Sequence, residues 1–248
     1  MSTRISESIY KWLNFVQFRL FSPVCVLCRQ PGQQRTDLCR ACQWSLPRIQ
    51  HPCHCCALPL PPGEYAQTRC GRCLVHPPFY ARMIAALDYK PPVTALVAGF
   101  KYNDRLVNGR VLASSLGELL QSAYTQEQLP GLLLPVPLHA RRLRQRGYNQ
   151  SLQLARWLSR DTGIPVAPEL VIRTRDTPHQ TGLGAAQRRK NLRGAFQLNP
   201  AVKIPSSTPV AIVDDVVTTG TTVNEMARVL LKGGACEVHV WALARTVV

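Results

Sequence analysis

The sequence predicts an α/β protein, in which a mostly parallel sheet carries helices on both faces and follows a small cysteine-rich module. Two observations predict this. Nine of the ten cysteines lie between Cys25 and Cys73, in a stretch where strongly apolar runs are scarce. Beyond that stretch, strand-like and helix-like segments alternate, which is typical of parallel sheets with helical crossovers. We therefore divide the chain into residues 1–24, a cysteine-rich module over 25–80 and a globular domain over 81–248.

The composition indicates a folded and strongly basic chain. Its 248 residues are 46% hydrophobic and 18% charged, which excludes global disorder. Thirty Lys and Arg residues against 14 Asp and Glu give a formal net charge of +16, which favours a polyanionic partner. We expect no transmembrane segment, because no apolar run approaches the length of a membrane-spanning helix. The N-terminus carries no secretory signal, so a cytoplasmic location is expected.

The first segment, residues 1–24, has apolar residues at helical spacing. It predicts a short amphipathic helix. We expect this helix to pack on the body of the protein, with contact to a membrane or a partner as the alternative. The residues that make the apolar stripe are Ile5, Ile9, Leu13, Val16 and Leu20.

The cysteine-rich module contains four CxxC pairs, separated by ten, ten and thirteen residues. One CxxC turn presents two thiolates to a metal, so two turns complete the four-sulfur tetrahedron of a structural Zn²⁺ site. We therefore predict two structural Zn²⁺ ions, on which this core-poor segment folds. Sequential pairing of the CxxC turns is the simplest arrangement and interleaved pairing is the alternative, whereas a disulfide framework fits poorly without a secretory signal. The predicted ligands are Cys25, Cys28, Cys39, Cys42, Cys53, Cys56, Cys70 and Cys73.

The globular domain alternates predicted strands and helices along its length. Cys236, in its last turn, is expected to be a core residue. The predicted strands are 83–88, 132–136, 170–173, 210–213 and 238–243, and the predicted helices are 93–102, 111–123, 151–160 and 221–232.

The most informative stretch is residues 210–222, where an apolar strand is followed by Asp214 and Asp215 and then by a hydroxyl-rich loop. Side chains at the carboxyl end of a parallel strand lie where ligands bind in open α/β sheets. A loop of N–H groups and hydroxyls at a helix N-terminus suits a phosphate, because the amides and the helix dipole both favour an anion. The two carboxylates then make sense as ligands of ribose hydroxyls or of a Mg²⁺ shell. The loop residues are Thr218, Thr219, Gly220, Thr221 and Thr222.

This stretch resembles the 5-phosphoribosyl-1-pyrophosphate motif of type I phosphoribosyltransferases. Other parts narrow the resemblance: the CxxC pairs, residues 100–102 (Phe-Lys-Tyr), the basic run 135–151, and residues 180–183, 188–191 and 194–196. Together they resemble the ComF family of competence and DNA-utilisation proteins. The resemblance extends from Cys25 onward and leaves the N-terminal segment unexplained. It implies a zinc module joined to a phosphoribosyltransferase fold, acting in the uptake or use of external DNA, with the DNA-uptake machinery as a possible partner.

If the site is catalytic, the resemblance implies that a nitrogen nucleophile displaces pyrophosphate from the anomeric carbon. Asp214 and Asp215 would hold the ribose hydroxyls and stabilise the positive charge on the sugar. The hydroxyl-rich loop would hold the 5′-phosphate. Lys101 and the basic residues from Arg141 to Arg146 would draw off the pyrophosphate with Mg²⁺.

Charge is concentrated between residues 139 and 193, which contain twelve Lys or Arg and three Asp or Glu, a net charge of +9. Such a cluster suits pyrophosphate, single-stranded DNA or both. The run from Arg141 to Arg146 lacks an amphipathic pattern and is expected to be a functional loop. Tyr102, Tyr148 and Trp157 are aromatic residues that could stack bases, although each could equally fill a core.

Two functions are therefore open. In the first, the chain is a DNA-handling factor that binds phosphoribosyl pyrophosphate and single-stranded DNA. In the second, it is an active salvage phosphoribosyltransferase that transfers phosphoribosyl to a nitrogenous base. The fold alone does not choose between them.

Overall fold

The computed structural model describes residues 23–33, 36–63, 68–175, 192, 194–204 and 207–247. The helix expected in residues 1–24 and the motifs at 180–183 and 188–191 therefore lie outside the described residues, apart from positions 23 and 24. The chain divides into two compact units, Met1–Leu46 and Pro47–Val248. The first four predicted zinc ligands belong to the smaller unit, and the other four belong to the larger.

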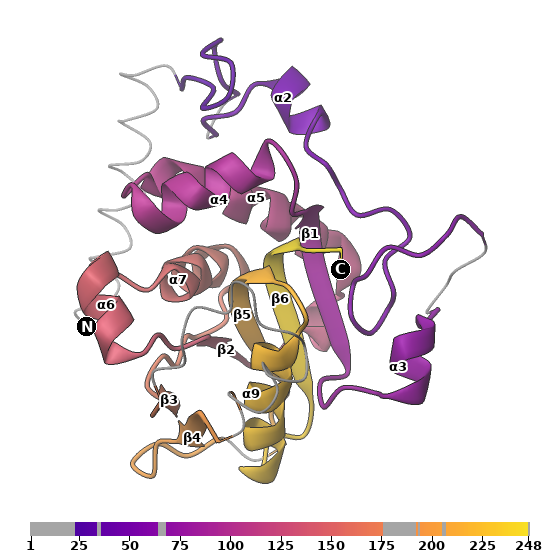
Figure 1. Ribbon diagram of the computed structural model, residues 1–248, viewed down its shortest axis with the longest axis vertical. Coiled ribbons are helices and arrows are strands. Elements are labelled where there is room, and N and C mark those ends of the chain that lie inside the picture. The colour runs from indigo at the N-terminus through magenta and orange to yellow at the C-terminus, as the bar shows by residue number, and fades with distance from the viewer. Residues whose placement is uncertain are drawn as a thin grey trace. The chain divides into compact units, whose positions relative to one another are not determined.

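A parallel sheet forms the centre of the larger unit (Figure 1). Its strands lie in the order β1-β6-β5-β2, and all neighbouring pairs are parallel. The carboxyl ends of all four strands therefore meet at one edge, which places β5 and its acid pair beside β6. The strands are β1 (Arg82–Asp88), β2 (Leu132–Pro135), β5 (Val210–Val217) and β6 (Val238–Arg245).

Helices cover both faces of this sheet, as predicted. On one face, α5 (Leu106–Ala123) packs on β1 and β6, and α7 (Gln150–Thr162) packs on β2 and β5. Helix α4 (Val93–Tyr102) packs on α5. On the other face, α9 (Thr221–Lys232) buries Val223, Met226 and Leu230 in one cluster with alternate strand residues such as Ile212 and Val240. Because neighbouring strand residues point to opposite faces, the two helical layers share the sheet as a common core.

Several elements are longer than predicted, and helix α5 and strand β5 are extended the most. Helix α5 begins at Leu106 rather than residue 111, because tertiary contacts hold its first turn against α4. Asn108 Nδ2 donates to the Leu96 carbonyl at 3.3 Å, and a Cβ on Gly109 would lie 2.5 Å from the Phe100 ring. Strand β5 runs to Val217 rather than residue 213, because its ladder with β6 continues to the pair Val217 and Arg245.

Two other segments differ in kind from the prediction. The strand predicted at 170–173 is β3 (Val171–Arg173), which pairs antiparallel with β4 (Phe196–Leu198) in a separate sheet. The basic run expected to be a loop forms helix α6 (Ala140–Arg146). This helix has a local start and stop: His139 accepts the N–H of Arg141, and Gly147 ends it at a φ of 78°, where glycine is favoured.

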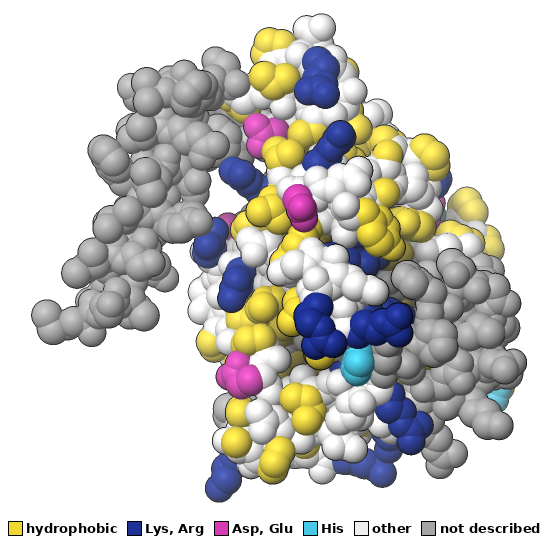
Figure 2. All heavy atoms as spheres, turned by 60° about the vertical axis from the view of Figure 1, so that its left-hand side comes forward, with side chains coloured by type: hydrophobic (Ala, Val, Ile, Leu, Met, Phe, Trp, Pro, Cys, Tyr) yellow, Lys and Arg dark blue, Asp and Glu magenta, His cyan; other side chains and the backbone are white. Residues whose placement is uncertain are grey.

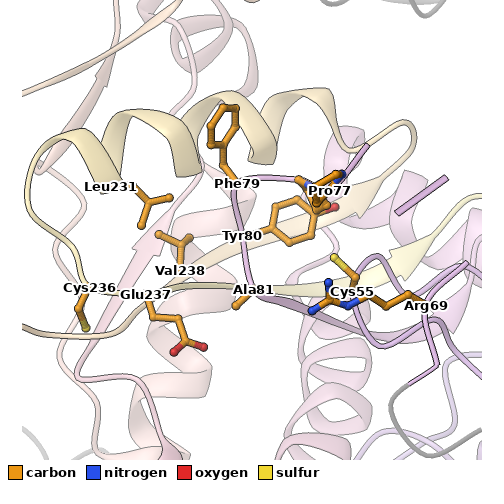
Figure 3. A pocket seen from close by; sticks show the side chains of 11 residues that line it. Cys55, Arg69, Pro77, Phe79, Tyr80, Ala81, Leu231, Cys236, Glu237 and Val238 are labelled. Carbon is orange, nitrogen blue, oxygen red and sulfur yellow. The ribbon is translucent and has the colours of Figure 1, made fainter. Parts of the chain in front are cut away.

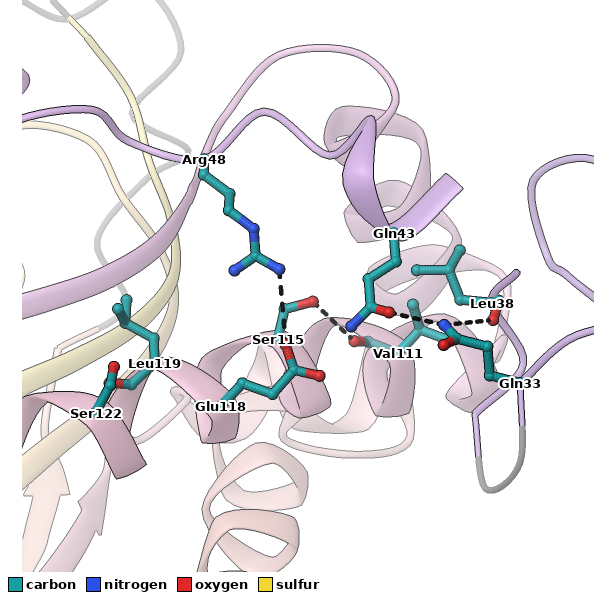
Figure 4. Close-up of polar contacts among 9 residues, drawn as sticks. All are labelled: Gln33, Leu38, Gln43, Arg48, Val111, Ser115, Glu118, Leu119 and Ser122. Atoms are coloured by element: carbon teal, nitrogen blue, oxygen red, sulfur yellow. Dashed lines mark hydrogen bonds and ion pairs between the residues drawn. The ribbon is translucent and has the colours of Figure 1, made fainter. Parts of the chain in front are cut away.

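The smaller unit contains α2 (Arg40–Trp44), which follows directly after Cys39. Gln33 Nε2 donates to Gln43 Oε1 at 2.7 Å and to the Leu38 carbonyl at 3.4 Å (Figure 4). These bonds join the turn near Cys28 to α2. They keep the two halves of this small unit together where little apolar surface is buried.

Short elements and surface contacts complete the larger unit. Helix α3 (Gly71–Val75) lies within the second group of cysteines, and a 3₁₀ turn covers Gln126–Gln128. Arg48 pairs with Glu118 of α5 at 3.6 Å (Figure 4). Cys236, expected in the core, is exposed because it lies in the turn before β6. No helix in the described part of the chain combines the length and apolar character that crossing a membrane requires.

Candidate functional site

The cysteines form two groups of four, paired sequentially. Within each group the sulfur atoms all lie within 4.8 Å of one another. A tetrahedral Zn²⁺ with bonds of about 2.3 Å separates its sulfurs by roughly 3.8 Å, so both groups fit the ion. The first cysteine site is Cys25, Cys28, Cys39 and Cys42, and the second cysteine site is Cys53, Cys56, Cys70 and Cys73. The structure brings the eight predicted cysteines together in the sequential arrangement, and their role as zinc ligands stays a prediction.

Within each site, thiols have pKa values shifted in opposite directions. Burial opposes ionisation of Cys25, but backbone N–H groups that donate to its sulfur lower its pKa to about 6. In the second site, burial raises the pKa of Cys56 to about 12, while backbone N–H donors lower the pKa of Cys53. The N–H of Cys70 donates to Cys53 Sγ at 3.2 Å. Four thiolates this close need a cation to ionise together, which a Zn²⁺ ion provides.

The acid pair on β5 is held by a buried lysine. Lys101 Nζ, near the end of α4, lies 3.0 Å from Asp215 Oδ1, and the two side chains are 18% and 4% exposed. Burial works against the lysine charge, but the Asp215 carboxylate raises the pKa of Lys101 above its ordinary value. The other oxygen of Asp215, Oδ2, is buried and has no hydrogen-bond partner among the described residues. One acceptor in the site is therefore left for a ligand.

Asp214 lies beside the start of α7. Ser151 Oγ donates to Asp214 Oδ1 at 3.2 Å, and Ser151 is placed there because Asn149 caps α7 through the N–H groups of Ser151 and Leu152. Burial and the neighbouring charge of Asp215 raise the pKa of Asp214 to about 7. Near neutral pH the acid pair therefore carries little net negative charge, since Lys101 offsets Asp215 and Asp214 is partly protonated.

The hydroxyl-rich loop, residues 218–222, joins β5 to α9. Gly220 occupies the N-cap position at a φ of 78°, and no side chain caps the helix there. Thr219 Oγ1 and Thr221 Oγ1 lie 2.8 Å apart, and the first turn of α9 contains no acidic residue. Thr218 is exposed and Thr219, Thr221 and Thr222 are half-buried. Gly220 is buried, and the N–H of Thr221 donates to Thr219 Oγ1 at 3.4 Å. The loop is therefore partly exposed, through its threonine side chains, at a helix start whose dipole favours an anion.

The predicted basic ligands lie in two places. Lys101 lies at the acid pair, whereas Arg141 and Arg146 lie on α6, the helix that follows β2. The Arg146 guanidinium lies over the ring of Tyr102, 5.1 Å from its centroid, and Tyr102 is 63% exposed. Figure 2 shows dark-blue Lys and Arg side chains gathered beside a histidine on the face that it presents. Tyr148 and Trp157 instead pack on the buried Phe100 ring.

Sequence reasoning missed four polar residues around this edge of the sheet. Ser151 contacts the acid pair, Arg72 and Arg245 donate to carbonyls of the hydroxyl-rich loop, and Lys90 pairs with Asp88 at the end of β1. The one local signal available was the position of Lys90, two residues after the end of a predicted parallel strand. The other contacts join residues 63 or more positions apart in the sequence or depend on a register that no pattern reveals.

A hollow of about 300 Å³ lies elsewhere in the larger unit (Figure 3). It is lined by Ala81 and Val238, near the amino ends of β1 and β6, with Leu231 from α9 and with Cys55 and Arg69. It is thus at the opposite edge of the sheet from the acid pair. The candidate site is the open carboxyl edge rather than this hollow.

Comparison with known proteins gives two family matches. A double zinc ribbon domain matches residues 17–74, and a phosphoribosyl transferase domain matches residues 150–246. Among solved structures, the purine phosphoribosyltransferase from Pyrococcus horikoshii Ot3 covers 54% of this chain and 70% of its own, at 22% identity and a TM-score of 0.32. That likeness is too distant to carry any detail of the site.

Curated relatives match almost the whole chain. The DNA utilization protein YhgH of Escherichia coli O157:H7 is 38% identical over 230 residues, 90% of this chain and 97% of the relative. The competence protein F of Haemophilus influenzae is 36% identical over 236 residues, 94% of this chain and 99% of the relative. Together with the two cysteine sites and the parallel sheet, these matches show that the chain belongs to the ComF family, in which a double zinc ribbon precedes a phosphoribosyltransferase domain.

Proposed function

We propose that this chain binds 5-phosphoribosyl pyrophosphate at the carboxyl edge of its sheet and single-stranded DNA on its basic surface, and that it acts in the uptake or use of external DNA. One observation carries the proposal: the acid pair is followed, after two further residues, by a partly exposed, hydroxyl-rich loop that leads into the start of α9. This places acceptors for a sugar next to donors for a phosphate. The names of the relatives, DNA utilization protein and competence protein F, support the biological role.

The acid pair suits the ribose. Two neighbouring hydroxyl groups are donors, and Asp214 and Asp215 offer acceptor oxygens, including the buried Asp215 Oδ2 that has no partner among the described residues. Oxygen ligands of this kind also suit Mg²⁺, which we include as a companion of the ligand. When bound, Mg²⁺ would offset the charge of the pyrophosphate. Because the acid pair together with Lys101 carries little net negative charge near neutral pH, it does not strongly repel a phosphorylated sugar.

The hydroxyl-rich loop suits the 5′-phosphate. Thr219 and Thr221 offer hydroxyl groups, and the first turn of α9 offers N–H groups without a competing acid. Gly220 is required because its φ of 78° disfavours side chains. Lys101, Arg141 and Arg146 remain the proposed contacts of the pyrophosphate.

The basic helix α6 suits single-stranded DNA. It carries Arg141, Arg142, Arg144 and Arg146, and its last arginine lies over the exposed ring of Tyr102. Arginines neutralise phosphates and an exposed aromatic ring stacks a base, which is how single strands are bound without sequence preference. Eight cysteines arranged for metal binding suit a reducing compartment, so we include a cytoplasmic location in the proposal.

An active phosphoribosyltransferase is the second candidate, and the match to a phosphoribosyl transferase domain over residues 150–246 favours it. In that reaction a nitrogen atom of the acceptor forms a bond to the anomeric carbon as the bond to pyrophosphate breaks. Asp214 and Asp215 would stabilise the positive charge that develops on the ribose. Release of pyrophosphate with a panel of nitrogenous bases tests this candidate, and no release with any base would exclude it for that panel.

Calorimetric titration with phosphoribosyl pyrophosphate and Mg²⁺ tests the binding proposal. We expect one site per chain, with affinity at least about tenfold weaker in the Asp214→Asn, Asp215→Asn variant, because two charge-assisted contacts are lost. Asp104→Asn is the matched control, since Asp104 is exposed and lies outside the acid pair. Equal affinity in the wild type and the acid-pair variant would contradict the proposal.

A further inference from the structure

The second cysteine site shares its packing with the hydroxyl-rich loop. Cys53, Cys56 and Cys73 are buried in one hydrophobic cluster with Val217 and Val223. These two valines stand immediately before and after residues 218–222. The side chains that anchor both ends of the loop therefore belong to the same cluster as three ligands of the metal site.

Arg245 joins the metal site to the loop by hydrogen bonds. It ends β6, is 2% exposed, and donates from Nε to the Cys56 carbonyl at 3.0 Å. From Nη1 it donates to the carbonyl of Val217 at 3.0 Å and to the carbonyl of Thr218. A buried guanidinium with carbonyl partners on both sides fixes the distance between them, because leaving any of its N–H groups unpaired in the core is costly.

Arg72 makes a second connection. It lies on α3 between the ligands Cys70 and Cys73, and its Nη2 donates to the Thr219 carbonyl at 3.2 Å. Helix α3 has five residues, which is too short to be stable alone, so the metal that holds Cys70 and Cys73 also holds Arg72 in place.

The segment that leads from α3 into β1 touches the first turn of α9 as well. The N–H of Phe79 donates to Asn224 Oδ1 at 2.7 Å. The neighbouring Tyr80 is 5% exposed, and its hydroxyl group lies in van der Waals range of the Cβ position of Gly220. The second cysteine site and its connecting segment thus contact the loop at Thr218, Thr219 and Gly220, and contact α9 just beyond the loop at Asn224.

We propose that the second cysteine site is the support of the hydroxyl-rich loop, with Arg72 and Arg245 as positioning residues that transmit its geometry. Loss of the metal from this site then loosens residues 218–220 and weakens binding of a phosphorylated sugar. The effect on binding rests on the proposed function, whereas the effect on the loop does not. The first cysteine site belongs to the other compact unit and provides the control for metal loss as such.

Backbone ¹⁵N relaxation of the ligand-free full chain tests the effect on the loop. In Arg72→Ala we expect the order parameters of Thr219 and Gly220 to fall to the range of flexible backbone, below about 0.6. Arg69→Ala is the matched control, because Arg69 is an exposed arginine of the same zinc module that donates to no loop carbonyl in the structure. Order parameters that stay unchanged in Arg72→Ala would overturn the proposal.

The metal itself is tested with Cys70→Ser and Cys28→Ser, each of which removes one ligand from one site. We expect each variant to lose one equivalent of zinc, but only Cys70→Ser to loosen the loop. If Cys70→Ser does not fold, the relaxation measurement on Arg72→Ala decides the question, because Arg72 is exposed and is not one of the four cysteines of the site. Equal loosening in both cysteine variants would overturn the proposal.

Calorimetry with phosphoribosyl pyrophosphate and Mg²⁺ completes the test. We expect about tenfold weaker binding in Arg72→Ala and wild-type affinity in Arg69→Ala, since one charge-assisted hydrogen bond to the loop is lost. Wild-type affinity in Arg72→Ala would contradict the effect on binding. If the wild type itself does not bind, the proposed function fails, and the relaxation measurement still decides whether the metal site supports the loop.

Discussion

Replacing Lys101 by methionine tests how much the ion pair between Lys101 and Asp215 stabilises the fold. Lys101 Nζ and Asp215 Oδ1 lie 3.0 Å apart and both side chains are largely buried. At an effective dielectric constant near 20, two unit charges at this distance attract by about 5 kcal/mol. Methionine fills most of the same volume but leaves the Asp215 carboxylate uncompensated beside Asp214. Because breaking a buried pair by removing one partner typically costs about 3–5 kcal/mol, we expect Lys101→Met to lower the free energy of unfolding by about 3 kcal/mol at pH 8.

Urea denaturation of four proteins measures this effect: the wild type, Lys101→Met, Asp215→Asn and the double variant. The double variant should be less destabilised than the sum of the single variants, by about 2 kcal/mol, because the two groups interact directly. Lys90→Met is the matched control. Lys90 pairs with Asp88 at the same distance of 3.0 Å but is 60% exposed, so its loss should cost less than about 1 kcal/mol. A cost for Lys101→Met no greater than that for Lys90→Met would refute the reasoning.

Three further predictions follow from the site. The pKa of Asp214, raised to about 7, means that the folded chain holds a proton that the unfolded chain releases between about pH 4 and 7. The free energy of unfolding should therefore fall as pH rises through this window, by roughly 3 kcal/mol from this group between pH 5 and 8. Asp214→Asn should remove that fall in denaturation series at these two pH values, and an unchanged fall in the variant would contradict the raised pKa of Asp214. Metal analysis should find two zinc equivalents per chain, and fewer than two would break the assignment of the cysteine sites. In filter binding, the affinity for oligothymidylate should fall steeply as salt concentration rises. Replacing the four arginines of α6 by glutamine should reduce the slope of log affinity against log salt concentration by roughly 2–3, whereas the control Lys203→Gln, Lys232→Gln should leave it unchanged. Binding that hardly depends on salt would contradict the DNA proposal.

Much of the fold could be predicted from the sequence because its signals are local. Helix α9 and helix α4 have the predicted bounds, and the CxxC spacing predicted both groups of four cysteines. Helix α6 was missed because its run of arginines has no apolar face, so periodicity carries no information there. The boundary between a zinc module and a catalytic-type domain at residue 80 stays a prediction.

Part of the candidate site could also be predicted, because its signals are local in the sequence. The acid pair and the hydroxyl-rich loop are contiguous in sequence, so their neighbourhood could be read directly. Lys101 was expected in the site from the resemblance, but its ion pair with Asp215 was not. Ser151 and Arg245 were not predicted, because they reach the site through packing of α7 and β6 and their hydrogen bonds depend on distances that only the folded chain defines.

A crystal structure of the zinc-bound chain with phosphoribosyl pyrophosphate and Mg²⁺ is the most direct measurement. It should place the ribose hydroxyls on Asp214 and Asp215 and the 5′-phosphate among the amides and hydroxyls of residues 218–222. Density for the sugar phosphate at any other part of the molecule, with this edge of the sheet left to solvent, would contradict the account.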